Sequence, residues 1–189
     1  MGASGSTFQG YSKDFMDING NFSQTNGTFG APETMSVSGD FKPTGGTFFH
    51  NSATVKLDGS TTTNVDVNST LELYNLTVNK IPASPIVQFV QSSDLVVATG
   101  TLRMQDGLFL GAMTIESTGP LIHSSNWDGG DGTVKVTGAA RTINLGENGK
   151  FPQLVLLSSG TVVNLVGTAS TTLNNVTIGA GTLNANTSE

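Results

Sequence analysis

The chain repeats itself near its N-terminus, and this internal repeat limits the possible folds more than any other feature. Residues 18–29 align with residues 37–48 position for position, without a gap. Apolar residues at the starts of expected strands continue the period with a mean spacing of about 19.4 residues, at Ile18, Val37, Val55, Leu76, Leu95, Ile115, Val134, Leu154 and Leu173. A period of this length is typical of architectures in which each repeat stacks on its neighbour.

A longer correspondence links the two halves of the chain. Residues 54–59 resemble residues 133–138, and residues 73–78 fall opposite residues 151–156. Both separations equal about four of the short periods. This correspondence predicts that the matched segments lie four repeats apart in one stacked structure.

Apolar and polar residues alternate within each repeat, which is the pattern of a β-strand. Leu71, Leu73, Leu76 and Val78 are expected to point one way, and the polar residues among them the other way. Gly, Thr, Ser and Asn make up 45% of the chain. Because these residues are mediocre or poor helix formers, the composition argues against a helical bundle and favours short strands joined by turns.

These patterns predict an all-β fold, a right-handed parallel β-helix (β-solenoid) of nine to ten coils with about 19–20 residues each. Stacked coils lie about 4.8 Å apart, so the rod would be about 45 Å long. We expect residues 1–17 to be a leader and irregular N-terminal cap, and residues 18–189 to be one solenoid domain, a fragment of a longer repeat protein. The alternative is a β-sandwich, which needs no fixed repeat. The side chains expected to point into the coil interior include Val55, Leu76, Val134 and Leu154.

Charge and composition exclude several classes of partner. The net charge is −6, and the eight basic residues are scattered singly, so no basic stripe would neutralise a nucleic-acid backbone. No apolar run approaches the roughly 18 residues needed to span a bilayer, so we expect no membrane insertion in this segment. The chain has no Cys, which excludes disulfides and a thiol nucleophile. The first residues also lack the pattern of a signal peptide.

Residues 39–48, followed by residues 53–59 and 73–79, resemble the Gly/Thr/Asn-rich repeats of large bacterial and archaeal cell-surface proteins. In those repeats a Gly-Thr-Val-x-Phe-x-Gly strand precedes a Phe-Tyr-Asn-Leu-Thr-Ile-Asn strand. The resemblance implies secreted, adhesin-like proteins built as long solenoid stalks, and it implies no catalytic residues. Two departures occur in the second copy of the pattern: Pro152 replaces an aromatic residue, and residues 126–130 are inserted.

The inserted segment and the residue after it contain the candidate binding residues. Asp128 lies in the insertion and Asp131 directly follows it, three residues apart among glycines. Oxygen ligands of this kind could hold Ca²⁺, although the spacing fits neither an EF-hand loop nor the Gly-Gly-x-Gly-x-Asp repeat. Trp127, with Asn126 beside it, could instead stack on a glycan or on another ligand from an exposed loop. The alternative to both is a plain corner loop.

The remaining polar residues favour a protein that is not an enzyme. His50 and His123 are separated by nearly four coils, so they cannot share a metal, and each is expected at a strand end on the surface. The carboxylates are spread singly over different coils, whereas glycoside cleavage needs two of them close together. Asp40 and Asp58 are the one pair that could stack as neighbours. Thr-rich surfaces also suggest ice binding, but no Thr column recurs in every coil.

The sequence therefore predicts a non-enzymatic extracellular module, a rigid stalk or filament segment at the cell surface. Its expected partners are further copies stacked end to end, neighbouring solenoid domains, or a cell-surface glycan or protein. The alternatives are a glycan- or ligand-binding module that uses the corner around Trp127, and a segment of a phage or virus fibre. No cofactor is expected apart from the possible Ca²⁺.

Overall fold

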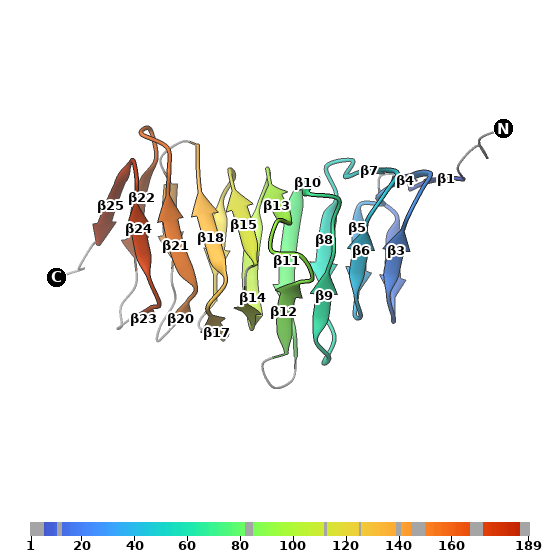
Figure 1. Ribbon diagram of the computed structural model, residues 1–189, viewed down its shortest axis with the longest axis horizontal. Helices are drawn as coiled ribbons and strands as arrows, with labels where there is room; N and C mark the ends of the chain where they lie inside the picture. The colour runs from blue at the N-terminus through green and yellow to red at the C-terminus, as the bar shows by residue number, and fades with distance from the viewer. Residues whose placement is uncertain are drawn as a thin grey trace.

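The computed structural model is a parallel β-solenoid with no helix in the part of the chain that it describes (Figure 1). It describes residues 6–10, 13–81, 85–111, 113–124, 126–138, 141–144, 150–166 and 172–185. Every strand pair is parallel, and successive turns lie side by side along one long axis. The predicted solenoid is therefore confirmed, and the sandwich is excluded because its sheets would be antiparallel.

Each turn contributes strands to three faces. The first face contains β2 (Phe15–Ile18), β5 (Thr34–Val37), β8 (Thr54–Leu57), β11 (Asn75–Asn79), the start of β14 (Leu102–Leu110), β16 (Leu121–His123), β19 (Arg141–Asn144), β22 (Val162–Val166) and β25 (Thr182–Ala185). The second face contains β3 (Phe22–Gln24), β6 (Phe41–Pro43), β9 (Thr63–Val65), β12 (Ile86–Phe89), the end of β14, β17 (Trp127–Gly130), β20 (Lys150–Phe151) and β23 (Thr172–Leu173).

The third face is interrupted, and we call it the split face. Its N-terminal sheet contains β1 (Thr7–Gln9), β4 (Thr28–Gly30) and β7 (Thr47–Phe49). Its second sheet contains β10 (Thr70–Leu73), β13 (Leu95–Ala98), β15 (Thr114–Ser117), β18 (Thr133–Val136), β21 (Gln153–Leu156) and β24 (Val176–Ile178). β7 and β10 do not pair with each other, so the face changes sheets between them.

Corner length explains this break in the split face. β7 ends at Phe49, and four residues separate it from β8, which begins at Thr54. β10 ends at Leu73, and only Tyr74 separates it from β11. Because β8 and β11 pair with each other, the two corners place β7 and β10 at different positions along the turn. The two strands therefore cannot form a ladder, and a groove lies between them.

The strand register confirms the N-terminal repeat and corrects the coil count. Phe22 pairs with Phe41 and Phe29 pairs with Phe48, as the alignment of the first two repeats requires. Further along, Leu76 pairs with Leu102, a separation clearly longer than the predicted period. The extra residues lie between the strands, where β12 begins at Ile86 after β11 ends at Asn79 and β13 begins at Leu95 after β12 ends at Phe89. The solenoid consequently has about eight turns, not nine to ten, and at about 4.8 Å per turn it is about 38 Å long.

The longer correspondence is not a structural repeat. Residues 54–57 form β8 on the first face, whereas residues 133–136 form β18 on the split face. Two similar short sequences thus form strands on two different faces, because any half-buried strand needs the same alternation of apolar and polar residues. The prediction that these segments lie a whole number of repeats apart is wrong.

The solenoid also begins before the predicted boundary at Ile18. β1 pairs with β4 and β2 pairs with β5, so residues 7–9 and 15–18 already belong to stacked turns. Of the expected leader and cap, residues 1–5 and 11–12 lie outside the described residues, as do residues 186–189 at the other end.

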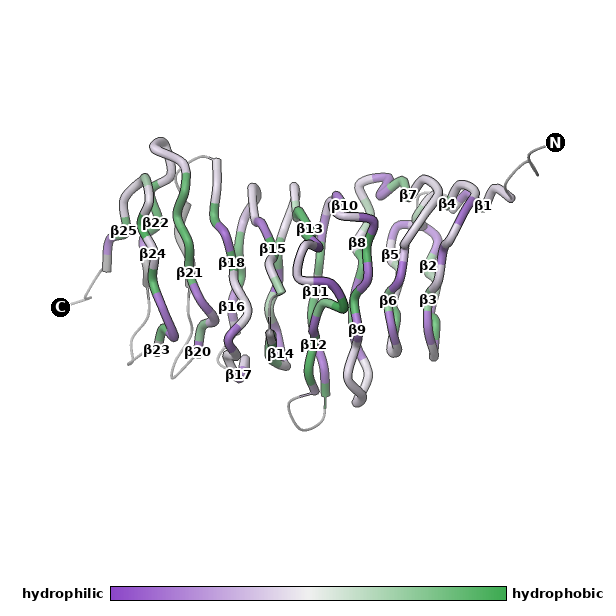
Figure 2. Tube along the Cα trace, viewed as in Figure 1, coloured by the Kyte–Doolittle hydropathy of each residue, from purple (hydrophilic) through white to green (hydrophobic). Residues whose placement is uncertain are grey.

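Inward-facing side chains form one continuous core. Hydropathy alternates along the strands as the sequence predicts (Figure 2). The first turns are filled by phenylalanines, with Phe22 stacked on Phe41 and Phe29 stacked on Phe48, each with 5.4 Å between ring centroids. Aliphatic side chains fill most of the later turns. The four residues predicted to face the interior are all at most 2% exposed: Val55, Leu76, Val134 and Leu154.

Candidate functional site

The predicted corner around Trp127 is part of the core. Trp127 begins β17 and is only 1% exposed, and its ring packs edge-on against Phe109 with 4.6 Å between centroids. The indole Nε1 donates a hydrogen bond to the Gly129 carbonyl oxygen at 3.1 Å. The prediction that Trp127 stacks on a ligand from an exposed loop is therefore wrong. Its run of glycines suggests a loop, but pairing with β14 makes the segment a strand.

The neighbouring Asp128 and Asp131 line a small hollow together with Lys150. Asn126 is exposed, and its backbone N–H donates a hydrogen bond to Ser124 Oγ at 3.3 Å. Asp131 Oδ1 accepts a hydrogen bond from the Gly111 N–H at 2.7 Å. Burial, with the nearby Asp128 carboxylate, raises the pKa of Asp106. Within the described residues no three His, Cys, Asp or Glu side chains are grouped to hold a metal, so the Ca²⁺ hypothesis for Asp128 and Asp131 gains no ligand set.

The two histidines occupy different environments. His123 is 4% exposed, its Nε2 lies 3.0 Å from the Lys150 carbonyl oxygen, and its ring lies 5.3 Å from that of Phe151. The expectation that His123 lies on the surface is wrong, because it occupies an inward position of β16. His50 follows β7 and is partly exposed, as expected for a strand-end residue.

Asp40 and Asp58 do not pair with each other. Each forms an ion pair with a lysine two residues away: Lys42 Nζ lies 2.6 Å from Asp40 Oδ2, and Lys56 Nζ lies 3.1 Å from Asp58 Oδ2. Burial alone would raise the pKa of Asp40, but hydrogen bonds from Lys42 and Asn64 outweigh it and lower the pKa.

A fully buried lysine is the main charged feature that the sequence does not predict. Lys80 follows β11 and is 0% exposed. Its Nζ donates to Thr63 Oγ1 at 2.8 Å, to the Ser38 carbonyl oxygen at 3.3 Å, and to the Asp58 carbonyl oxygen. Burial lowers the pKa of Lys80, and the charges of Asp58 and Asp40 oppose that change. Lys80 thus ties three successive turns together from inside.

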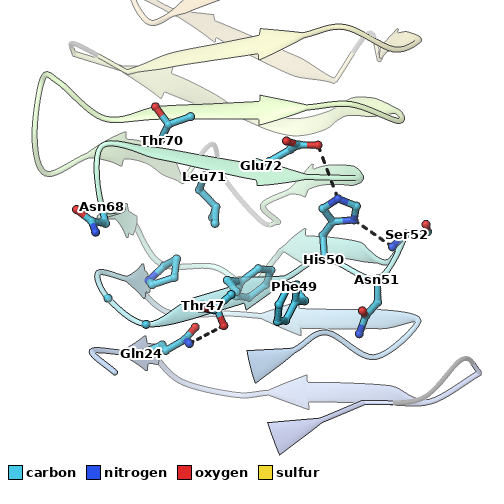
Figure 3. Close-up of a pocket in the computed structure, with 14 residues that line it drawn as sticks. Gln24, Thr47, Phe49, His50, Asn51, Ser52, Asn68, Thr70, Leu71 and Glu72 are labelled. Atoms are coloured by element: carbon cyan, nitrogen blue, oxygen red, sulfur yellow. Dashed lines mark hydrogen bonds and ion pairs between the residues drawn. The ribbon is translucent and has the colours of Figure 1, made fainter. Parts of the chain in front are cut away.

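A groove lies between β7 and β10, and we call it the split-face groove (Figure 3). It has a volume of about 580 Å³, which is within the usual range for ligand sites. One wall comes from β7 and the corners on both sides of it, and the other comes from β10 and Asn68 before it. The groove exists because the two strands do not pair.

An imidazole and a carboxylate face each other across this groove. His50 Nδ1 accepts a hydrogen bond from the Ser52 N–H at 3.1 Å, which leaves the proton of the neutral ring on Nε2. His50 Nε2 points toward Glu72 Oε1, 3.8 Å away (Figure 3). Asn51 and Ser52 adopt positive φ angles of 47° and 57°, which turn the chain sharply after β7. The corner conformation therefore fixes the imidazole.

Aromatic rings lie exposed beside this pair. Phe49 is 51% exposed and Tyr74 is 40% exposed. The Tyr74 ring stacks against His50 with 6.1 Å between centroids and an interplanar angle of 21°. The sequence gives little indication of this contact, because His50 and Tyr74 lie in different repeats and are brought together only by stacking of the turns.

No protein-family model, curated protein or solved structure matches this chain. Among the described residues, no helix has the length and apolar character required to cross a bilayer.

Proposed function

We propose that the chain is a non-enzymatic structural module, a rigid spacer or filament segment of an extracellular surface protein. The observation that carries this proposal is the unbroken stacking of the first face, where parallel pairs link β2 to β25 through every turn. A core that runs the whole length of the rod resists bending, because bending would separate packed side chains on one side.

Polar side chains reinforce the stack from outside. On the second face, Asn64 Nδ2 donates to Asp40 Oδ1 at 2.9 Å, and Gln88 Nε2 donates to Asn64 Oδ1 at 2.9 Å. On the first face, Asn184 Nδ2 donates to Asn164 Oδ1 at 2.9 Å. These bonds run along the rod axis, so pulling the turns apart would break them together with the ladder bonds. That arrangement suits a load-bearing stalk.

The last described turn offers a surface on which another solenoid could stack. Ile178 pairs with the buried Leu156 and so belongs to an inward-facing column, yet it is 50% exposed. Val176 pairs with Leu154 and is 40% exposed. Within the described residues, β24 has one strand partner, β21. A second copy of the chain, or a neighbouring solenoid domain, would cover these side chains and pair the open edge.

The cell-surface location and adhesive role rest on the resemblance to Gly/Thr/Asn-rich surface repeats. The mixed polar exterior and the low content of charged residues, 12%, are compatible with that role. In this view the rod holds a binding region away from the cell, or it links such regions in series.

Self-association tests the proposal directly. We expect electron microscopy and sedimentation to show that the chain forms longer rods as its concentration rises, with an axial repeat of about 38 Å. Ile178→Lys places a charge in the open inward column and should block stacking. Thr177→Lys is the matched control, because Thr177 lies in the same strand but pairs with the half-buried, outward-facing Val155. A strictly monomeric particle at high concentration would contradict end-to-end stacking, and a compact shape would contradict the spacer role.

A further inference from the structure

We propose that the split-face groove is a binding site for a neutral carbohydrate chain. The site is separate from the ends through which the rod would stack. The inference does not depend on the spacer role, because a groove on the side of the rod can bind a ligand whether or not chains assemble. It rests on the exposed rings, the fixed polar groups and the charge of the groove wall.

The exposed rings supply the apolar part of a sugar site. The faces of aromatic rings carry partial negative charge and attract the weakly positive C–H groups of a pyranose ring. Phe49 lines the groove, and Tyr74, which is not one of the lining residues, stacks against His50 beside it. Half-exposed aromatic side chains cost free energy in water, so a ligand that covers them gains from their burial.

The polar groups of the groove match the hydroxyl groups of a sugar, each of which both donates and accepts hydrogen bonds. Glu72 supplies acceptor oxygens and neutral His50 supplies an Nε2–H donor. Asn68 supplies an amide that can do both. Because the Ser52 N–H holds the imidazole in place, part of the ordering cost of binding is already met in the free protein.

The charge of the groove excludes anionic ligands. Glu72 is the only Asp, Glu, Lys or Arg among the residues that line it. A sulfate, phosphate or uronic acid would therefore meet a carboxylate and no compensating cation. The ligand that fits the charge of this groove is an uncharged oligosaccharide.

A peptide strand fits the groove less well. Thr47 N–H donates to the Gly27 carbonyl oxygen, and the Phe49 carbonyl oxygen accepts from the Ala31 N–H, so both residues direct their backbone groups toward β4. Only the intervening Phe48 directs its backbone groups toward the groove. Strand addition draws its affinity from a series of main-chain hydrogen bonds, which one residue of β7 cannot supply. Strand addition at the edge of β10, which pairs only with β13 among the described strands, is tested by the peptide comparator.

Nuclear magnetic resonance titration of the isotope-labelled chain tests the proposal. The probes are neutral hexasaccharides of glucose, galactose and mannose, with a sulfated oligosaccharide and an extended polar peptide as comparators. We expect at least one neutral probe to cause saturable shifts confined to residues 47–52 and 68–74. The sulfated probe and the peptide should leave these resonances unchanged.

Variants separate a specific site from weak surface contact. Phe49→Ala should weaken binding by roughly tenfold, the upper range for one aromatic contact, because Phe49 lines the groove and is 51% exposed. Leu157→Ala is the matched control, because Leu157 is 49% exposed but lies outside the groove. Glu72→Gln keeps the shape of the side chain and should retain binding of the neutral probe, while it weakens the discrimination against the sulfated one. Unchanged thermal unfolding shows that each variant remains folded.

Three results would overturn the carbohydrate site. They are the absence of shifts with every neutral probe up to its solubility limit, shifts that Phe49→Ala does not alter, and tighter binding of the sulfated probe or the peptide. None of them bears on assembly into rods, which the Ile178→Lys experiment measures separately.

Discussion

Single residues hold this solenoid together by occupying inward columns. Leu76 is 2% exposed and pairs with Val55 on one side and Leu102 on the other. We expect Leu76→Ala to lower the free energy of unfolding by about 2–4 kcal/mol, because the cavity lies between turns that cannot close it. Thr61→Ala, at an exposed corner, should leave stability nearly unchanged. Urea unfolding of both variants measures the difference, and equal losses would contradict the inward column.

Lys80 shows how one buried charge can be accommodated inside a solenoid. Its ammonium group donates hydrogen bonds to a hydroxyl and to two carbonyl oxygens of earlier turns, and these acceptors take the place of water. A buried charge is costly unless hydrogen bonds compensate it, and here they come from a corner whose backbone acceptors face inward.

The lowered pKa of Lys80 predicts a pH dependence of stability. Between its folded pKa and the ordinary value of 10.5, the unfolded chain binds the proton more tightly than the folded chain does. Stability should therefore rise with pH in this range through the contribution of Lys80. The variant Lys80→Met lacks this titration. Urea unfolding from neutral pH up to 10.5 should show the wild type gaining stability relative to Lys80→Met, and a constant difference would contradict this account.

At the scale of elements, close approach between turns limits which residues a strand can contain. Gly130 ends β17 with a φ of +105°, and a Cβ placed on it would lie 1.8 Å from the Phe109 carbonyl oxygen. The strand can pair with β14 only because this position has no side chain. The glycines that suggest a loop in the sequence are thus what allows a strand to lie here.

Gly130→Ala should therefore destabilise the protein by about 1–3 kcal/mol through backbone strain and the clash with β14. Gly160→Ala is the control, because a Cβ at Gly160 meets nothing within 4 Å and its φ is not positive. Thermal unfolding compares the two variants. A Gly130→Ala protein as stable as the Gly160→Ala protein would show that β17 and β14 are not packed as described.

At the scale of the whole molecule, a solenoid turn depends on its neighbours, so the position of a turn sets its local stability. β15 pairs with strands on both sides, whereas all three residues of β24 are exposed. We expect the amides of β24 to exchange with solvent at least roughly a hundredfold faster than those of β15. Hydrogen exchange measures both. Protection of the β24 amides should rise at concentrations where rods form. Equal exchange rates for β24 and β15 in dilute monomer would contradict the dependence of each turn on its neighbours.

The split-face groove is also a property of the whole molecule. It appears where phenylalanine-filled turns give way to the turn whose β10–β11 corner is a single residue. Each of its walls is an ordinary strand with an ordinary corner. Only the offset between β7 and β10 turns them into a cavity.

The sequence determined the local structure of this protein, because alternation and corner glycines are encoded within a few residues. Val55 and Leu76 are recognisable as core residues from their strands alone, and the first two turns align residue for residue. The coil count and the matching of distant segments could not be obtained this way, because loops of unequal length shift the register and similar strands serve different faces.

Tertiary structure alone decided which side chains meet. Trp127 and His123 are buried by strands that pair with theirs from neighbouring turns, and Lys80 finds its acceptors in residues up to 42 positions away. His50, Glu72 and Tyr74 form one group because two strands that occupy successive turns fail to pair. Contacts of this kind depend on the accumulated length of every intervening corner, a quantity that no local pattern contains.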